Sequence, residues 1–412
     1  AVVDFMIREK SQARIDSIVI TGLEKTKRHV IVRELKFKTG EIIRYSRLLD
    51  SQRHLYLTGL FESVFIRPES TMAGDSSRKN ILIETKEKSS SEFSVSVGYG
   101  SIEKVRGRIE LNTRNLAGSA RQSGVAFEAS FIKQGVTASF SDPWTLGSRW
   151  QTDSRVYGYL RQEPAYDAAT YGSQLTVGRR LTPYTTTSLG YRFENTSLSD
   201  VELHASTQNL DPRIRSLIVS ILHDTRDSFF DTQRGWYAAW TNELEGSFLQ
   251  GSNTFARSII TLKCFIPTGQ ETVIGAALEA GWMDSFSGSE EIPLNERFYA
   301  GGPTTLRGFG YQMVGPQDED GNPPGGKFKI VWNAVEIRRS IYKIVGGTVF
   351  MDIGNVWSDI DAFRLKDLRL NLGAGLRVNS PIGIIRLDYG ANLDPRPGEP
   401  KGKLFLGMGQ AF

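Results

Sequence analysis

The sequence predicts a mainly β protein, in which a sixteen-stranded antiparallel transmembrane β-barrel follows one small α+β domain of order β-α-α-β-β. The barrel is predicted by residues 91–412, where apolar residues alternate with small or polar ones in sixteen segments. The clearest segments run for about ten residues, the length that a tilted strand needs to cross a bilayer. Short and long connections also alternate, as they do in outer-membrane barrels.

Composition excludes several other classes. Only 39% of residues are hydrophobic, and no run reaches the roughly 18 apolar residues that a membrane-spanning helix requires. The net charge is +4 with scattered Lys and Arg, so we expect no nucleic-acid binding. The single cysteine, Cys264, cannot form an internal disulfide, and we expect it to be buried or lipid-facing in a strand.

The chain is divided into three parts. Residues 1–10 alternate like a strand and show no leader pattern, so we expect a remnant of an upstream domain or a linker. Residues 11–90 form the small domain. A polar segment around residues 86–91 then leads into the barrel, residues 91–412.

The small domain is predicted to have the order strand, helix, helix, strand, strand. A strand over 15–20 precedes helices over 27–37 and 45–57, and strands follow over 63–67 and 80–87. Gly59 is placed to end the second helix. That helix offers four apolar residues that could cover one face of a sheet: Leu48, Leu49, Leu55 and Tyr56.

In the barrel, one face of each strand should contact lipid and the other a polar interior. Leu372 and Leu376 alternate with Asn371 and Arg377, and the same register turns Glu336 and Asp352 inward. The alternative is a soluble sandwich or propeller, but its core would not place charged residues so regularly on one face of a strand.

The connections follow this orientation. Short periplasmic turns are expected at 182–184, 268–270 and 380–381, and long outer loops at 196–213, 284–327 and 354–366. The turn at 225–234 is a long exception on the periplasmic side.

Catalysis has little support. The four histidines lack metal-ligand spacing, and neither a nucleophile elbow nor a phosphate-binding loop occurs. His223 precedes Asp224, but adjacent strand residues point to opposite faces, which disfavours a role as a base. We therefore expect no catalytic residue, no metal and no cofactor.

The longest loop carries a specific resemblance. Its Leu306-Arg307-Gly308-Phe309 is similar to the (V/I/L)-R-G-(F/Y) motif in the sixth extracellular loop of the BamA/TamA superfamily of outer-membrane assembly factors. HDTRDSFFDTQRGW (223–236), FMDIGNVW (350–357), GLRVNSPIGIIRLDYG (375–390) and the terminal Phe412 also resemble its barrel. ITGLEKTKRHVIVREL and YLTGLFESVFI resemble its POTRA module, so the resemblance covers nearly the whole chain. It implies a loop folded back into the barrel and a periplasmic POTRA domain.

We expect Arg307, Gly308 and Phe309 to form a latch with Glu336 and Asp352, which match the family's acidic partners. An arginine inside a barrel needs paired charge and satisfied donors, which carboxylates on the wall provide. Gly308 should permit a tight turn and Phe309 should pack beside the guanidinium. The alternative is an exposed loop with a solvated Arg307.

The first and last strands should meet at a seam that can open sideways and offer a template strand. We expect the seam to comprise Val97, Gly98, Tyr99, Gly100, Gly407, Gly409 and Phe412. Glycines disfavour strand interiors and would weaken the pairing, although they also accommodate barrel curvature.

Two functions are compatible with these residues. The first, which the resemblance favours, is insertion of β-barrel clients into an outer membrane through the seam. Its partners would be unfolded clients, outer-membrane lipids, and accessory lipoproteins or an inner-membrane protein bound by POTRA domains. The second is a two-partner-secretion-type translocation pore. A plain diffusion porin would leave the front domain and the Arg307 loop without a role. The front domain resembles the last POTRA domain of a BamA-type factor, so we expect a BamA-type chain truncated to that domain. A barrel of this length leaves a TamA-type factor as the alternative.

Overall fold

The computed structural model describes residues 12–70, 77–203, 209–269, 271–286, 291–381 and 383–412. The strand expected at 1–10 lies outside them. The chain forms two compact units. One contains the residues up to Ser94 with 111–124 and 140–143, and the other contains the remainder. No helix in the described ranges is long and apolar enough to cross a membrane.

The small domain has the predicted order of elements. These are β1 (Arg14–Thr21), α1 (Arg28–Val32), α2 (Tyr45–Leu57), β2 (Phe61–Ser70) and β3 (Arg78–Glu87). The central strand β3 runs parallel to β1 and antiparallel to β2. The helices bury Val30, Ile31, Leu48 and Leu55 in a core shared with the sheet.

Two details of the helices differ from the prediction. Helix α1 ends at Val32 rather than near residue 37, because the nitrogens of Glu34 and Leu35 bond to carbonyls three residues earlier, in tighter turns. On α2, Leu49 and Tyr56 are 57% and 60% exposed, since each lies one residue beyond the buried stripe. Gly59 follows α2 with a φ of 71°, the left-handed conformation expected where a helix ends.

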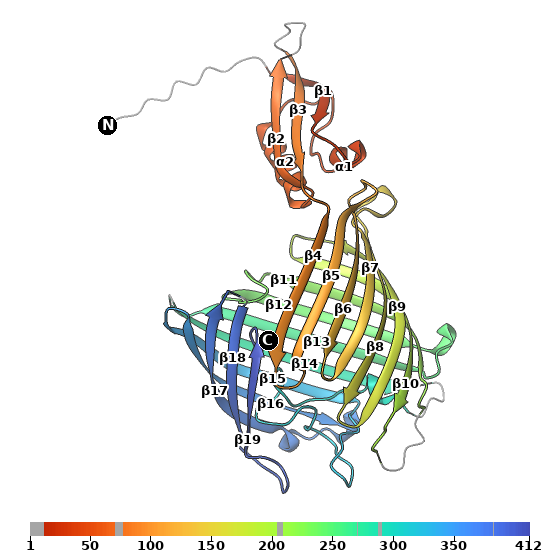
Figure 1. Cartoon of the computed structure of the whole chain (residues 1–412), viewed down its shortest axis with the longest axis vertical. Coiled ribbons are helices and arrows are strands. Elements are labelled where there is room, and N and C mark those ends of the chain that lie inside the picture. The colour runs from red at the N-terminus through yellow and green to blue at the C-terminus, as the bar shows by residue number, and fades with distance from the viewer. Residues whose placement is uncertain (1–11, 71–76, 204–208, 270, 287–290, 382) are drawn as a thin grey trace. The chain divides into compact units, whose positions relative to one another are not determined.

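The barrel is one antiparallel sheet whose sixteen strands pair in sequence order, with β4 and β19 at its two ends (Figure 1). Its strands are β4 (Ser91–Gly100), β5 (Lys104–Leu116), β6 (Arg121–Ser130), β7 (Lys133–Asp142), β8 (Gln151–Glu163), β9 (Tyr166–Arg180), β10 (Thr185–Ser199), β11 (Arg213–Asp224), β12 (Gly235–Glu245), β13 (Phe255–Pro267), β14 (Thr272–Ser285), β15 (Phe328–Tyr342), β16 (Val345–Trp357), β17 (Arg369–Ser380), β18 (Gly383–Asn392) and β19 (Gly402–Met408). The predicted strand number and fold class are confirmed.

The barrel is apolar outside and polar inside. Phe127, Trp240 and Leu376 are 52%, 49% and 53% exposed on the outer face, whereas Arg377 and Asp388 on the inner face are 5% and 1% exposed. A soluble sandwich would bury the first set and expose the second. The pattern is that of a barrel whose outer face contacts lipid.

The connections also follow the prediction. Among the described residues, 181–184, 268–269, 271 and 381 lie between neighbouring strands at one end of the barrel. The described parts of the long loops, residues 200–203, 209–212, 291–327 and 358–368, lie at the other end. Short 3-10 turns occur within the described loops at Thr145–Gly147, Ser247–Leu249, Leu294–Glu296, Ile360–Ala362 and Leu365–Asp367. The long exception at 225–234 joins β11 to β12.

Candidate functional site: an in-folded loop and a lateral seam

The loop between β14 and β15 carries Arg307 into a fully buried position. Its Nε donates to Oδ2 of Asp352 at 3.0 Å, and its Nη2 donates to Oδ1 at 2.7 Å. The remaining nitrogen, Nη1, donates to Glu336. The main-chain nitrogen of Arg307 also donates to Asp352, at 3.2 Å. The guanidinium thus has the paired charge and satisfied donors that burial demands.

The two carboxylates have further partners on the barrel wall. Asp352 accepts hydrogen bonds from Nδ2 of Asn333 at 2.8 Å and of Asn371 at 2.9 Å. Glu336 accepts from Nε of Arg338 at 2.7 Å. Asn333 could not be found by alternation, because a β-bulge between Asn333 and Val335 shifts the register and turns it inward.

The aromatic contacts of the loop differ from the expectation for Phe309. The ring beside Arg307 is Phe350 of β16, whose centroid lies 3.4 Å from the guanidinium carbon. Phe309 is buried against Arg369 instead, with the guanidinium carbon 4.9 Å from its centroid. Arg369 in turn forms a bidentate ion pair with Glu399, with N–O distances of 2.8 and 2.6 Å. Phe309 therefore belongs to a second contact between loop and wall.

Gly308 lies in the expected tight turn, since the nitrogen of Phe309 donates to the carbonyl of Leu306 at 3.2 Å, although its φ is not in the left-handed range. Gly308 also permits close packing. A Cβ at Gly308 would lie 2.5 Å from Cβ of Asn371. On the opposing strand, a Cβ at Gly390 would lie 2.4 Å from the carbonyl oxygen of Arg307. Only glycine at both positions lets the loop main chain approach the wall this closely.

A further anchor of the loop is formed by Glu296, which the sequence analysis missed. Its carboxylate is buried and accepts from Nη1 and Nη2 of Arg192 at 3.1 and 3.0 Å. Nη1 of Arg257 lies 3.0 Å from the same carboxylate, and both arginines also pair with Glu243. No motif signals this cluster, since its members are spread over β10, β12, β13 and the loop.

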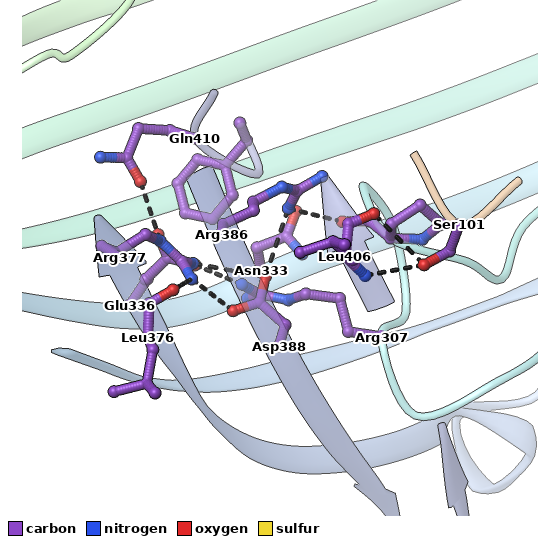
Figure 2. Close-up of polar contacts among 12 residues, drawn as sticks. Ser101, Arg307, Asn333, Glu336, Leu376, Arg377, Arg386, Asp388, Leu406 and Gln410 are labelled. Carbon is purple, nitrogen blue, oxygen red and sulfur yellow. Dashed lines mark hydrogen bonds and ion pairs between the residues drawn. The ribbon is translucent and has the colours of Figure 1, made fainter. Parts of the chain in front are cut away.

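The lateral seam is defined here as the facing edges of β4 and β19. Within the described residues, no ladder joins these strands. Their contact is local: the nitrogen of Ser101, just after β4, donates to the carbonyl of Leu406 at 2.9 Å, and the nitrogen of Leu406 donates to Oγ of Ser101 at 2.7 Å (Figure 2). All residues of β4 from Ser91 to Val97 are exposed.

The seam residues expected from the sequence are only partly brought together. A Cβ at Gly98 would lie 3.5 Å from Sδ of Met408, so these strands approach each other there. Val97 and Tyr99 are 69% and 42% exposed. Gly407 lies in β19 and abuts Arg386, whose Nε would be 3.2 Å from a Cβ at that position. Gly100, at the end of β4, has open space around it.

Phe412 is not a seam residue, and its assignment was wrong. The chain leaves β19 after Met408, and Gly409 has a φ of 83°, which turns residues 410–412 inward. The Phe412 ring lies 6.1 Å from that of Phe265 in β13 and 5.4 Å from the guanidinium carbon of Arg338. The last residues therefore pack on the inner wall near the latch.

Polar contacts connect the inner wall to these last residues. Asp388 pairs with Arg377 at 2.5 Å and with Arg386 at 3.3 Å, and Nε of Arg377 donates to Gln410 at 3.3 Å (Figure 2). Nη1 of Arg386 donates to the loop carbonyl of Pro303 at 2.9 Å. Loop, wall and C-terminal segment thus share one polar network.

The described residues include no group of three or more His, Cys, Asp or Glu side chains placed to hold a metal ion. His223 contacts Oγ1 of Thr185 at 3.0 Å, while the carboxylate of Asp224 binds Arg226. Cys264 is half-buried in β13.

Comparison with known families identifies both parts of the chain. A family model described as the Omp85 superfamily domain matches residues 115–412. A model described as POTRA, surface antigen variable number repeat, matches residues 13–88.

Among curated proteins, the chain is similar over its full length to outer membrane protein assembly factor BamA of Nitratidesulfovibrio vulgaris, at 25% identity and covering 53% of that protein. It is 25% identical to the sorting and assembly machinery component 50 homolog of Bos taurus, over 95% of this chain and 85% of that protein. The chain spans about half the length of the bacterial relatives that it matches.

Solved structures agree with the fold. BamA from Haemophilus ducreyi lacking POTRA domains 1–3 superposes with a TM-score of 0.83 at 20% identity, covering 97% of this chain and 85% of that one. CdiB from Acinetobacter baumannii has a TM-score of 0.60 at 14% identity, covering 97% of this chain and 74% of that one.

Proposed function

This chain belongs to the Omp85 superfamily, and we propose that it folds and inserts β-barrel proteins into the outer membrane through its lateral seam. In this proposal residues 11–90 are a periplasmic POTRA domain, and residues 91–412 are the barrel, with the loop over 284–327 folded inside. The relatives named as outer membrane assembly factors support this assignment.

The observation that carries the proposal is the weakness of the seam. Ser101 and Leu406 make the main-chain contact between its edges, and the preceding residues of β4, Ser91 to Val97, are exposed. An unpaired strand edge offers N–H and C=O groups on which another strand can form. A client strand would therefore pair with β4 and enter the bilayer as the seam widens.

The latch formed by Arg307, Gly308, Glu336 and Asp352 would keep the rest of the wall rigid while the seam moves. Its ion pairs connect the loop to β15 and β16. The proposed role of the latch is structural, because nothing about client insertion requires a reaction at these groups.

The proposed activity requires no catalytic residue, nucleotide or cofactor, because a barrel in lipid satisfies its main-chain hydrogen bonds and buries its apolar face. Its partners would be unfolded barrel clients and outer-membrane lipids. The edges of the POTRA sheet would bind clients, accessory lipoproteins or an inner-membrane partner by strand addition.

The test is insertion of a radiolabelled β-barrel client into liposomes containing the protein. In a Cys264→Ser background, cysteines replacing Ser101 and Leu406 would close the seam by a disulfide. A matched disulfide between Leu189 and Val219, which already pair in β10 and β11, controls for cross-linking itself.

We expect the wild type to accelerate insertion, the seam disulfide to abolish the acceleration and a reductant to restore it. The control disulfide should have no effect. Absence of acceleration by the wild type, together with salt conductance through the lumen, would instead support the alternative of a polypeptide translocation pore.

A further inference from the structure

The turn between β11 and β12 presents two exposed aromatic side chains on an ordered scaffold. Oδ1 of Asp227 accepts from the nitrogen of Gln233 at 3.0 Å, which fixes the turn across its width. Phe229 and Phe230 are nevertheless 76% and 79% exposed, and their rings meet edge to face with centroids 5.3 Å apart. An ordered segment that exposes apolar rings in this way is typical of a binding surface.

Phe230 faces the barrel interior rather than lipid. It lines a cavity of about 860 Å³ together with Arg106, Arg108 and Glu128. These three lie on the inner face, since their neighbours Val105, Ile109 and Phe127 are the exposed apolar residues of the same strands. A membrane-anchoring role for Phe230 would require the opposite orientation.

The turn is also attached to the seam. Nε2 of Gln410 donates to Oδ1 of Asp231, next to Phe230, at 3.0 Å. Gln410 lies two residues after the end of β19, in the inward-turned C-terminal segment. The aromatic pair and one side of the seam therefore belong to one assembly.

The cavity combines three surfaces that fit an extended polypeptide. Ser96, Val97 and Gly98 contribute part of the β4 edge, which offers main-chain hydrogen bonds. Phe230, Ile384 and Met408 contribute apolar contacts. The charged lining includes both signs: Glu103, Arg106, Arg108, Glu128 and Lys133. A volume of several hundred Å³ accommodates a short peptide segment.

We propose that Phe229 and Phe230 form a client-binding site at which an extended segment of alternating apolar and polar residues is held beside β4. The apolar side chains of the segment contact Phe230, its polar side chains face the charged wall, and its main chain lies along the β4 edge. The inference rests on the proposed function, because it names the contact that precedes strand addition.

The test uses the full chain in detergent micelles and a synthetic peptide of residues 402–412, which contains β19 with Leu404, Leu406 and Met408 at alternate positions. A scrambled peptide without alternation is the comparison. A photoreactive phenylalanine analogue is placed at position 230, and at Tyr184 as control, because Tyr184 is a 57% exposed aromatic residue on a neighbouring periplasmic turn. The double variant Phe229→Ala/Phe230→Ala is compared with Tyr184→Ala.

We expect cross-linking of the alternating peptide at 230 and not at 184, and roughly tenfold weaker peptide binding by the double variant. Phe230→Leu should retain most of the affinity. Because both rings are exposed, the variants should keep the heat-modifiable migration of a folded barrel.

Equal cross-linking of the scrambled peptide would overturn the inference, as would unchanged affinity in the double variant. Client insertion into liposomes is measured separately. If the wild type fails to accelerate insertion, the proposed function is wrong, whereas wild-type insertion by a folded double variant contradicts this site alone.

Discussion

Two regions of the same barrel are built in opposite ways. One is the inner wall, which holds the loop, and the other is the seam, where the sheet ends. At the wall, Arg307, Glu336 and Asp352 are fully buried and satisfy one another across two strands and a loop. At the seam, Ser101 and Leu406 provide a local contact between otherwise unpaired strand edges.

The difference teaches where a barrel of this kind tolerates change. Breaking a buried ion pair leaves an uncompensated charge in a dry site and is strongly destabilising, whereas an exposed hydrogen bond is readily replaced by water. The wall is therefore expected to determine the stability of the fold. We expect the seam to open at small cost, as the proposed insertion mechanism requires.

Arg307→Ala should have the largest effect, because it leaves the carboxylates of Glu336 and Asp352 buried without their main cation. We expect a loss of about 3–5 kcal/mol in the free energy of unfolding, with lower yield of assembled barrel. Urea unfolding in lipid and heat-modifiable migration on gels measure both.

Arg307→Lys is the matched variant, since it retains the positive charge but loses the planar guanidinium that donates to both carboxylates. The free energy of unfolding of Arg307→Lys should lie between those of the wild type and Arg307→Ala. Wild-type migration together with unchanged client insertion by Arg307→Ala would remove the reason to regard this wall as the stable region.

Glu296→Gln tests whether the loop has a second anchor of lower strength. The change removes the negative charge that pairs with Arg192 and Arg257, but both arginines remain paired with Glu243. We expect a loss of about 2 kcal/mol and faster proteolysis within the loop. If stability and proteolysis match the wild type, the loop depends on the Arg307 latch alone.

Low pH should loosen the contact of Phe309 through Glu399. Burial alone would raise the pKa of Glu399, but hydrogen bonds from Arg369 and from the main chain of Arg396, with the charge of Arg369, lower it from 4.5 to about 2. A lowered carboxyl pKa gives stability that is present above the unfolded value and is lost as pH falls through the folded one.

The difference in unfolding free energy between the wild type and Glu399→Gln should therefore be largest above about pH 5 and shrink toward about pH 2. Groups that titrate in both proteins cancel in this comparison. A difference that stays constant over that range would show that the ion pair with Arg369 does not stabilise the fold.

Alternation made the barrel predictable, and the resemblance of Leu306-Arg307-Gly308-Phe309 to the family motif, together with charge pairing, made the Arg307 latch predictable. Period-two spacing turned Glu336 and Asp352 inward, and a buried guanidinium needs such partners. Asn333 was missed because a bulge reverses its face, and Glu296 because its partners Arg192 and Arg257 lie far from it in the sequence.

The fine packing depended on backbone geometry that residue types do not determine. Phe350 rather than Phe309 lies over Arg307, because the loop turns Phe309 toward Arg369. Phe412 leaves the seam since Gly409 adopts a left-handed φ that only the folded chain reveals. Such positions are decided by which surfaces meet in three dimensions.

Ser101→Ala should have the smallest effect on the free energy of unfolding. Its effect on amide hydrogen exchange should be confined to the seam. It removes the Oγ that accepts from the nitrogen of Leu406 at 2.7 Å, but water can replace this exposed partner. We expect the unfolding free energy to fall by less than about 1 kcal/mol and the exchange of the Leu406 amide hydrogen to rise by up to about fivefold. Ser380→Ala, which removes a hydroxyl bonded to the carbonyl of Gly383 in a turn outside the seam, is the control and should leave exchange in β19 unchanged. A stability loss in Ser101→Ala as large as that in Arg307→Ala would mean that the seam, too, holds the barrel together, and the contrast between the two regions would fail.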